Sequence, residues 1–98
     1  MTKEQIILQL SENKEFLQSK FYLETIALFG SYARNENSEK SDIDLLVTFS
    51  NKTNDLYSVK SELKTYLHDL LKSDVDICNE KYIKPFYKTQ ILSEAIYV

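Results

Sequence analysis

The sequence contains very few of the residues that interrupt or cross-link a polypeptide. Its 98 residues include one glycine, one proline, one cysteine and no tryptophan. A single cysteine excludes both a disulfide framework and a zinc site built from several cysteines. The sequence also has no repeat, no low-complexity segment and no obvious linker. Because Gly30 is the only glycine, we expect a special backbone requirement at that position.

Long hydrophobic runs and positive charge are also scarce. No apolar run approaches the length of a membrane span, and residues 1–20 are too charged for a secretory signal, so we expect a cytoplasmic protein. The formal net charge is −3 without a basic run, which disfavours nucleic acid as a substrate. With 43% hydrophobic and 28% charged residues, the chain has the composition of a soluble globular protein, and its length predicts a single domain over residues 1–98.

Hydrophobic periodicity predicts alternating helices and strands. The predicted helices cover residues 3–20, 31–36, 55–72 and 85–95, and the predicted strands cover 24–29, 42–49, 74–78 and 96–98. Thr2 and Gln5 have the spacing of a capping box for the first helix. In the last helix, Phe86, Ile91, Leu92 and Ala95 are expected to cover one side. This order predicts an α/β (α+β) fold, a small sheet flanked by helices with a site at strand ends.

Two aspartates enter the second predicted strand. Asp42 and Asp44 are two residues apart, so we expect them on one face of the strand while Ile43 points into the core. Two ionised carboxylates this close repel each other unless a cation neutralises them, and Mg²⁺ accepts such ligands together with phosphate oxygens. Asp76, between Val75 and Ile77, is placed on the next strand to be a third ligand. Asp74 is the weaker candidate because it starts that strand.

The Gly-Ser turn at the end of the first predicted strand supplies a complementary feature. A backbone without a side chain at Gly30 lets N–H groups approach a phosphate closely. Ser31 would present its hydroxyl and N–H to a triphosphate. Arg34, the only arginine, could offer its guanidinium to the same anion. A phosphate cradle beside paired carboxylates predicts metal-dependent phosphoryl or nucleotidyl transfer.

Three segments together resemble the signature of the DNA polymerase β-type nucleotidyltransferase superfamily, and in particular its minimal prokaryotic members, the MNT proteins. They are Gly30-Ser31-x-Ala33-Arg34, Ser41-Asp42-x-Asp44-Leu45 and Val75-Asp76-Ile77. The resemblance runs from about Glu24 to the C-terminus, and the tail from Ile83 through Glu94 also matches. It implies the minimal polymerase-β-like nucleotidyltransferase fold, with a small mixed sheet flanked by helices. One difference is Asn35, where many relatives have glycine; asparagine tolerates positive φ, so we expect the turn to survive.

The resemblance implies a role for each motif residue. Gly30 and Ser31 would hold the triphosphate of ATP. Asp42 and Asp44 would bind two Mg²⁺ ions, and Asp76 would bind the catalytic metal and help to activate the acceptor hydroxyl. The implied partner is a HEPN-type RNase toxin encoded nearby, to which AMP would be transferred, on a tyrosine. The chain would then be an Mg²⁺-dependent protein adenylyltransferase and the antitoxin of the pair, forming a hetero- or homo-oligomer.

Two alternatives remain at this point. The chain could neutralise its partner by binding alone, although a binder needs no cluster of repelling carboxylates. It could instead transfer a nucleotide to a small-molecule hydroxyl, although the sequence leaves no room for an acceptor domain. Other residues have plainer interpretations: His68 as a solvated surface residue, Cys78 as a small buried filler, and the aromatic residues Tyr82, Phe86 and Tyr87 as core packing or, with Lys81, Lys84 and Lys88 around them, as a partner surface.

Overall fold

The chain alternates helices and strands, and a computed structural model describes all of its residues, 1–98. The elements in order are α1 (Lys3–Glu12), α2 (Lys14–Phe21), β1 (Leu23–Phe29), α3 (Gly30–Ala33), β2 (Ile43–Phe49), α4 (Leu56–Leu71), β3 (Val75–Asn79), the 3₁₀ turn η1 (Glu80–Tyr82), α5 (Pro85–Glu94) and β4 (Ile96–Tyr97). No helix among them has the length and apolar character needed to cross a membrane.

The four strands form one mixed sheet in the order β3-β2-β1-β4. β1 is antiparallel to both β2 and β4, whereas β2 and β3 are parallel and are joined through α4. The small mixed sheet flanked by helices is confirmed. β1 and β2 lie at its centre, which explains their nearly continuous apolar sequences, because both faces of a central strand are covered.

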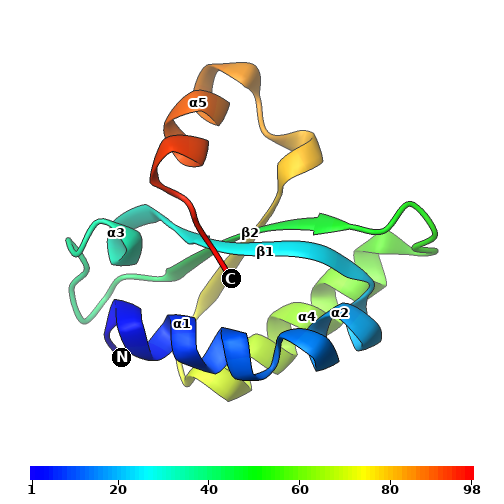
Figure 1. The fold of residues 1–98 in the computed structure, drawn as a ribbon, viewed down its shortest axis with the longest axis horizontal. Helices are drawn as coiled ribbons and strands as arrows, with labels where there is room; N and C mark the ends of the chain where they lie inside the picture. Colours follow the sequence, from blue (N-terminus) through cyan, green and yellow to red (C-terminus); the bar gives the residue numbers. More distant parts are fainter.

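The two faces of the sheet are covered unequally. Figure 1 shows α1, α2 and α4 packed along one face and α5 alone standing over the other. The helix-covered face holds a core of 16 buried residues, with Leu28, Leu45 and Leu67 among its fully buried side chains. The opposite face buries only Ala27, Phe29 and Leu46, with partly buried Ile91 and Ala95 packed against them. The second face is therefore covered mainly by α5 and carries much the smaller core.

The single helix predicted over residues 3–20 is wrong: α1 ends at Glu12 and α2 begins at Lys14. Asn13 separates them with φ −105° and ψ 4°, and its side-chain Nδ2 donates to the Gln9 carbonyl at 2.8 Å. An asparagine side chain competes with the main chain for helical hydrogen bonds, which is a local cause for the break. The predicted capping box is present, because Gln5 N donates to Thr2 Oγ1 at 3.1 Å and Thr2 N donates to Gln5 Oε1 at 2.8 Å.

The expectation that apolar residues of the last helix cover one side of it is also wrong in part. None of the residues of α5 is buried, and Phe86 is 86% exposed. Of the four apolar residues expected on that side, only Ile91 in the helix and Ala95 just after it pack against the smaller core cluster. The Phe86 ring instead contacts the Tyr87 ring edge-on, with centroids 5.1 Å apart. The aromatic side chains of Phe86 and Tyr87 therefore lie on the molecular surface and not in the core.

The exposure of Phe86 gives a direct prediction. Phe86→Ala is expected to change the free energy of unfolding by less than about 0.5 kcal/mol, because the ring is already in water. Leu67→Ala is the matched control: Leu67 is fully buried, and its truncation should cost about 2–5 kcal/mol. Urea denaturation followed by circular dichroism measures both. A loss above about 1 kcal/mol for Phe86→Ala would place the ring in the core.

Positive φ values mark the ends of several elements. Gly30 has φ 76°, and four other residues, Tyr22, Asn35, Asp55 and Lys72, have φ between 49° and 58°. The left-handed conformation of Asn35 (φ 58°) agrees with the expectation that asparagine supports the turn after Arg34. Four of the five left-handed positions are therefore occupied by residues other than glycine. Gly30 differs from them because its backbone is also in close contact with Asp44.

Candidate active site

Gly30, Asp44 and Asp76 lie next to one another across three adjacent elements. Asp44 of β2 pairs with Phe29, the last residue of β1, on one side and with Asp76 of β3 on the other. Gly30 follows Phe29 directly. The structure thus brings the Gly-Ser turn and two of the three predicted carboxylates together at one end of the sheet. Buried Val75 and Ile77 hold Asp76 in the strand, and Asp76 itself is exposed.

The contact between Gly30 and Asp44 explains why this position is glycine. A Cβ added to Gly30 would overlap Asp44 Oδ2 and would lie 2.9 Å from Asp44 Cγ. Its φ of 76° is also a conformation that residues with a side chain rarely adopt. The Asp44 carboxylate therefore lies directly against the Gly30 backbone, and the motif glycine and the motif aspartate depend on each other.

Asp42 lies outside the strand in which it was predicted. β2 begins at Ile43, and Asp42 is exposed just before it. The Ile43 N–H donates to the Asp74 carbonyl at 2.9 Å, which closes the start of the β2–β3 pair. Asp42 still stands two residues from Asp44, and its negative charge acts on the Asp44 carboxyl group. The Asp42 side chain is exposed to solvent, whereas that of Asp44 is partly buried.

Negative charge accumulates around Asp44. Its pKa is raised, first by partial burial and then by the charges of Asp76 and Asp42, while Arg34 acts in the opposite direction. Partial burial also raises the pKa of the Cys78 thiol, with further contributions from Asp76 and Asp44. Cys78 is two residues from Asp76 in β3, so alternation places both on the same face of the strand, where Cys78 is partly buried.

The carboxylates supply the kind of ligand that a divalent cation prefers. Asp42, Asp44 and Asp76 carry only oxygen donors, and their mutual repulsion would be relieved by a cation. The partly buried Asp44, pressed against Gly30, gives this donor set a fixed member. As the side chains stand, no group of three or more His, Cys, Asp or Glu residues is placed to hold a metal ion. The chemistry of the donor set fits Mg²⁺, and closing the set requires side-chain rotation.

The turn after β1 is held by both the core and a distant acidic residue. Tyr32 of α3 is buried in the main core cluster and anchors the turn. Arg34 Nε donates to Glu36 Oε2 and Arg34 Nη1 donates to Glu94 Oε2, both at 2.9 Å. Glu94 Oε1 accepts from the Gly30 N–H at 3.2 Å. The sequence suggested a phosphate contact or a surface position for Arg34, and the structure shows two carboxylates on its guanidinium.

Glu94 is the site residue that sequence reasoning missed. It was recognised only as part of the C-terminal tail, 60 residues away from Arg34 along the chain. Its side chain is 15% exposed, although it ends an otherwise exposed helix. The only indication in the sequence was that Glu94 directly precedes the short apolar segment that was predicted as the last strand. Pairing of β4 with β1 is what places it beside Gly30, since Ile96 lies opposite Leu28.

Asp74 and His68 lie outside this cluster. His68 Nε2 is 3.4 Å from Asp74 Oδ1, and both side chains are largely exposed. This agrees with the interpretation of His68 as a surface residue. It also separates Asp74 from Asp76, which faces Asp44 through the pairing of β2 and β3.

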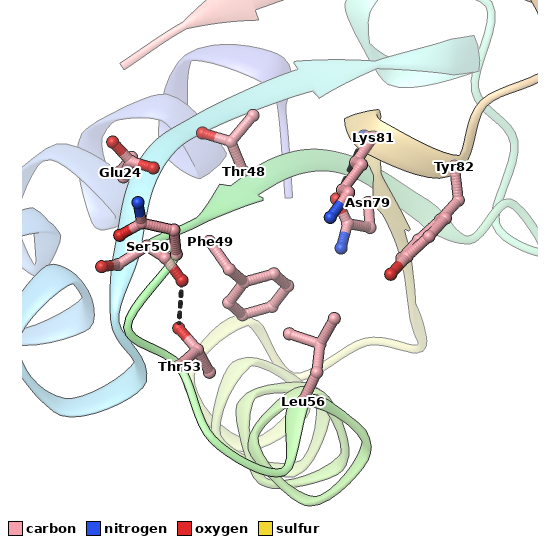
Figure 2. A pocket seen from close by; sticks show the side chains of 10 residues that line it. Glu24, Thr48, Phe49, Ser50, Thr53, Leu56, Asn79, Lys81 and Tyr82 are labelled. Atoms are coloured by element: carbon pink, nitrogen blue, oxygen red, sulfur yellow. Dashed lines mark hydrogen bonds between the residues drawn. The ribbon is translucent and has the colours of Figure 1, made fainter.

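The largest cavity lies elsewhere. This pocket of about 460 Å³ lies at the opposite end of β2. Figure 2 shows the apolar side chains of Phe49 and Leu56 in its lining, together with Asn79, Lys81 and Tyr82. Thr48 is the residue of its lining nearest in sequence to Asp44, about 13 Å away along an extended strand. None of Asp42, Asp44 and Asp76 lines it. The candidate active site is therefore the cluster of carboxylates beside Gly30, and the largest cavity is not part of it.

Comparison with known proteins gives consistent results. Residues 10–98 match the family model described as nucleotidyltransferase domain. The chain is 36% identical over 98 residues to the protein adenylyltransferase MntA of Thermococcus cleftensis, covering 100% of this chain and 97% of that protein. A solved structure described as a candidate minimal nucleotidyltransferase is similar with a TM-score of 0.83 and 33% identity, covering 98% of this chain and 95% of that one.

A solved toxin–antitoxin structure with AMP-PNP is also similar. The TM-score is 0.67 and the identity is 26%, over 99% of this chain and 72% of that one. The described similarity covers the fold from α1 to β4, since nearly the whole chain is aligned.

Proposed function

The chain belongs to the nucleotidyltransferase domain family, as a minimal nucleotidyltransferase, and we propose that it transfers AMP from ATP to a tyrosine hydroxyl of a HEPN-type partner toxin. By this transfer it would act as the antitoxin of the pair. The observation that supports the proposal is that Gly30, Asp44 and Asp76 lie next to one another at one end of the sheet. The relative named protein adenylyltransferase MntA and the similar toxin–antitoxin structure with AMP-PNP support the choice of donor and partner.

The carboxylates are proposed to hold Mg²⁺. Asp42 and Asp44 would bind two ions, with Asp76 as a further ligand of the catalytic one. Bound Mg²⁺ supplies electrostatic stabilisation of the negative charge on the transferring phosphoryl group. Asp44 would be the fixed ligand because the Gly30 backbone confines it, whereas the exposed Asp42 and Asp76 can turn toward a ligand.

The transfer is a substitution at the α-phosphorus of ATP. The acceptor oxygen forms the new bond to phosphorus, and the bond from phosphorus to the pyrophosphate oxygen breaks. The hydroxyl proton passes to a base, for which the exposed carboxylate of Asp76 is the best-placed side chain. Pyrophosphate leaves with the bonding electron pair. Because ATP is the donor, we expect the reaction in the cytoplasm.

Gly30, Ser31 and Arg34 are proposed to bind the triphosphate. Ser31→Ala is expected to weaken ATP binding about three- to tenfold, because one hydroxyl donor to a charged phosphate is lost. The melting temperature should stay within about 2 °C, since Ser31 is only partly buried and Tyr32 anchors the turn in the core. Isothermal titration calorimetry with AMP-PNP and Mg²⁺ measures the affinity. Unchanged affinity would remove Ser31 from the site.

The acceptor is proposed to come from a partner protein. β3, which carries Asp76, is an edge strand whose outer side no other strand covers, so a partner protein can approach this carboxylate. The exposed rings of Tyr82, Phe86 and Tyr87 lie on the neighbouring η1–α5 segment, where Lys81, Lys84 and Lys88 add positive charge. Exposed aromatic rings suit a protein contact, and the surrounding lysines suit a partner surface of opposite charge. The result would be a hetero-oligomer, and the acidic net charge disfavours a nucleic-acid acceptor.

One experiment separates the proposal from its alternatives. The purified chain is incubated with Mg²⁺, α-labelled ATP and the protein encoded next to it, and label on the partner is mapped by mass spectrometry. AMP on a partner tyrosine supports the proposal. Tight binding without label would favour neutralisation by binding alone, and label on an added small-molecule alcohol in place of the partner would favour the other transferase.

A further inference from the structure

Glu94 occupies the groups that are proposed to bind the triphosphate. One oxygen of its carboxylate accepts from the Gly30 N–H at 3.2 Å, and the other accepts from Arg34 Nη1 at 2.9 Å. The carboxylate is an anion with oxygen acceptors, as a phosphate is. The Glu94 side chain is only 15% exposed, whereas the Arg34 side chain that it pairs with is 40% exposed. The protein therefore provides its own anion at this position.

The position of Glu94 is fixed by the fold. It ends α5 and lies two residues before Ile96, which pairs with Leu28 in the strand that leads to Gly30. Ala95 packs against the smaller core cluster beside it. The negative charge of Glu94 is close enough to contribute to the raised pKa of Asp44. Glu94 is thus a fourth carboxylate at the site, contributed by the far end of the chain.

A triphosphate and the Glu94 carboxylate cannot use the same donors together. Two like charges this close together repel each other in the partly screened surroundings of a protein surface. Arg34 has further N–H groups, but the Gly30 amide has one. Nucleotide that uses the Gly30 amide must therefore remove Glu94 from it.

We propose, building on the function above, that Glu94 is a positioning residue that holds the Gly30 amide and Arg34 in the nucleotide-free protein and is displaced by the triphosphate. Glu94 then sets the nucleotide affinity, because each binding event must break its two contacts. Its displacement also releases the last turn of α5, so the state of the phosphate site is transmitted to the segment that carries the exposed aromatic rings.

The test compares two glutamates that contact the same arginine. Glu94→Gln removes the charge at the Gly30 amide, and Glu36→Gln removes the same charge from the other, 64% exposed, partner of Arg34. Binding of tripolyphosphate and of AMP-PNP, each with Mg²⁺, is measured by calorimetry. We expect Glu94→Gln to bind both anions about fivefold more tightly than the unaltered protein, and Glu36→Gln less than about twofold. Equal effects of the two variants, or weaker binding by Glu94→Gln, would overturn the proposal.

Hydrogen exchange gives a second readout that a purely structural clamp would not change. Tripolyphosphate should accelerate amide exchange in the peptide covering residues 90–98 of the unaltered protein and have little further effect in Glu94→Gln. Slower exchange on binding would show that Glu94 stays in place, which contradicts the proposal. Tripolyphosphate binding does not depend on AMP transfer. A tighter Glu94→Gln variant without any labelled partner would therefore retain this inference and refute the proposed function.

Discussion

Asp44→Asn is expected to reduce nucleotidyl transfer by about 10³-fold, because the variant loses a charged ligand for a metal whose stabilisation is worth several kcal/mol. The same substitution should leave the metal-free protein equally stable or more stable. Asp44 is partly buried among the charges of Asp76 and Asp42, and these raise its pKa. A neutral amide of the same shape removes that repulsion and keeps the packing against Gly30.

The pH dependence of stability follows from the direction of that shift. A carboxyl group with a raised pKa in the folded protein destabilises the fold once it ionises, so its cost appears as the pH rises above the unfolded value of about 3.9. The difference in melting temperature between Asp44→Asn and the unaltered protein should therefore be larger at neutral pH than below that value. Thermal unfolding in EDTA at both pH values measures it, and a variant less stable at neutral pH would contradict the assigned repulsion.

The neighbouring strand provides a matched control for activity. Asp76→Asn should reduce transfer as strongly as Asp44→Asn, because Asp76 lies opposite Asp44 across β2 and β3 and is proposed to bind the same metal. Asp74→Asn removes a carboxylate only two residues earlier, whose side chain is 81% exposed and lies near His68. Transfer by Asp74→Asn should stay within about twofold of the unaltered protein, as expected for a surface substitution. Loss of transfer in both variants would point to the net charge and not to a metal ligand.

The parts of the site that the sequence predicted are those governed by local rules. Alternation along each strand turned Asp44 away from the core that buries Ile43, and turned Asp76 away from the core that buries Val75 and Ile77. The left-handed turn at Asn35 followed from the tolerance of asparagine for positive φ. In these positions one or two neighbours in sequence determine the outcome.

The parts that the sequence did not predict depend on distant partners or on competition. Glu94 reaches Arg34 only because β4 pairs with β1, a relation between residues at opposite ends of the chain. Asn13 breaks a helix whose apolar spacing continues across it, and its side chain donates to the Gln9 carbonyl that its main-chain N–H also contacts. Phe86 has the hydrophobicity of a core residue and lies at the surface, and hydrophobicity alone does not distinguish a core from an interface.

Gly30→Ala is expected to have the most severe combined effect on stability and activity. Two separate costs arise at this residue. The φ of 76° alone costs about 1–2 kcal/mol for a residue with a Cβ. The new methyl group would also overlap Asp44 Oδ2, so either the β1–α3 turn or the Asp44 side chain must move. Because Asp44 is the proposed fixed metal ligand, transfer should fall below detection even in molecules that remain folded.

A double-mutant cycle with Asp44→Ala separates these two costs. Truncating Asp44 removes Oδ2 and Cγ, the atoms nearest the added methyl group, and leaves only the Asp44 Cβ at 3.0 Å. If the overlap is real, Gly30→Ala should destabilise the Asp44→Ala protein less than the unaltered one, by about 1 kcal/mol or more in urea denaturation. The remaining cost reports the backbone conformation. Strict additivity of the two substitutions would mean that Gly30 is needed for its φ alone, and the interdependence of the motif glycine and the motif aspartate would be refuted.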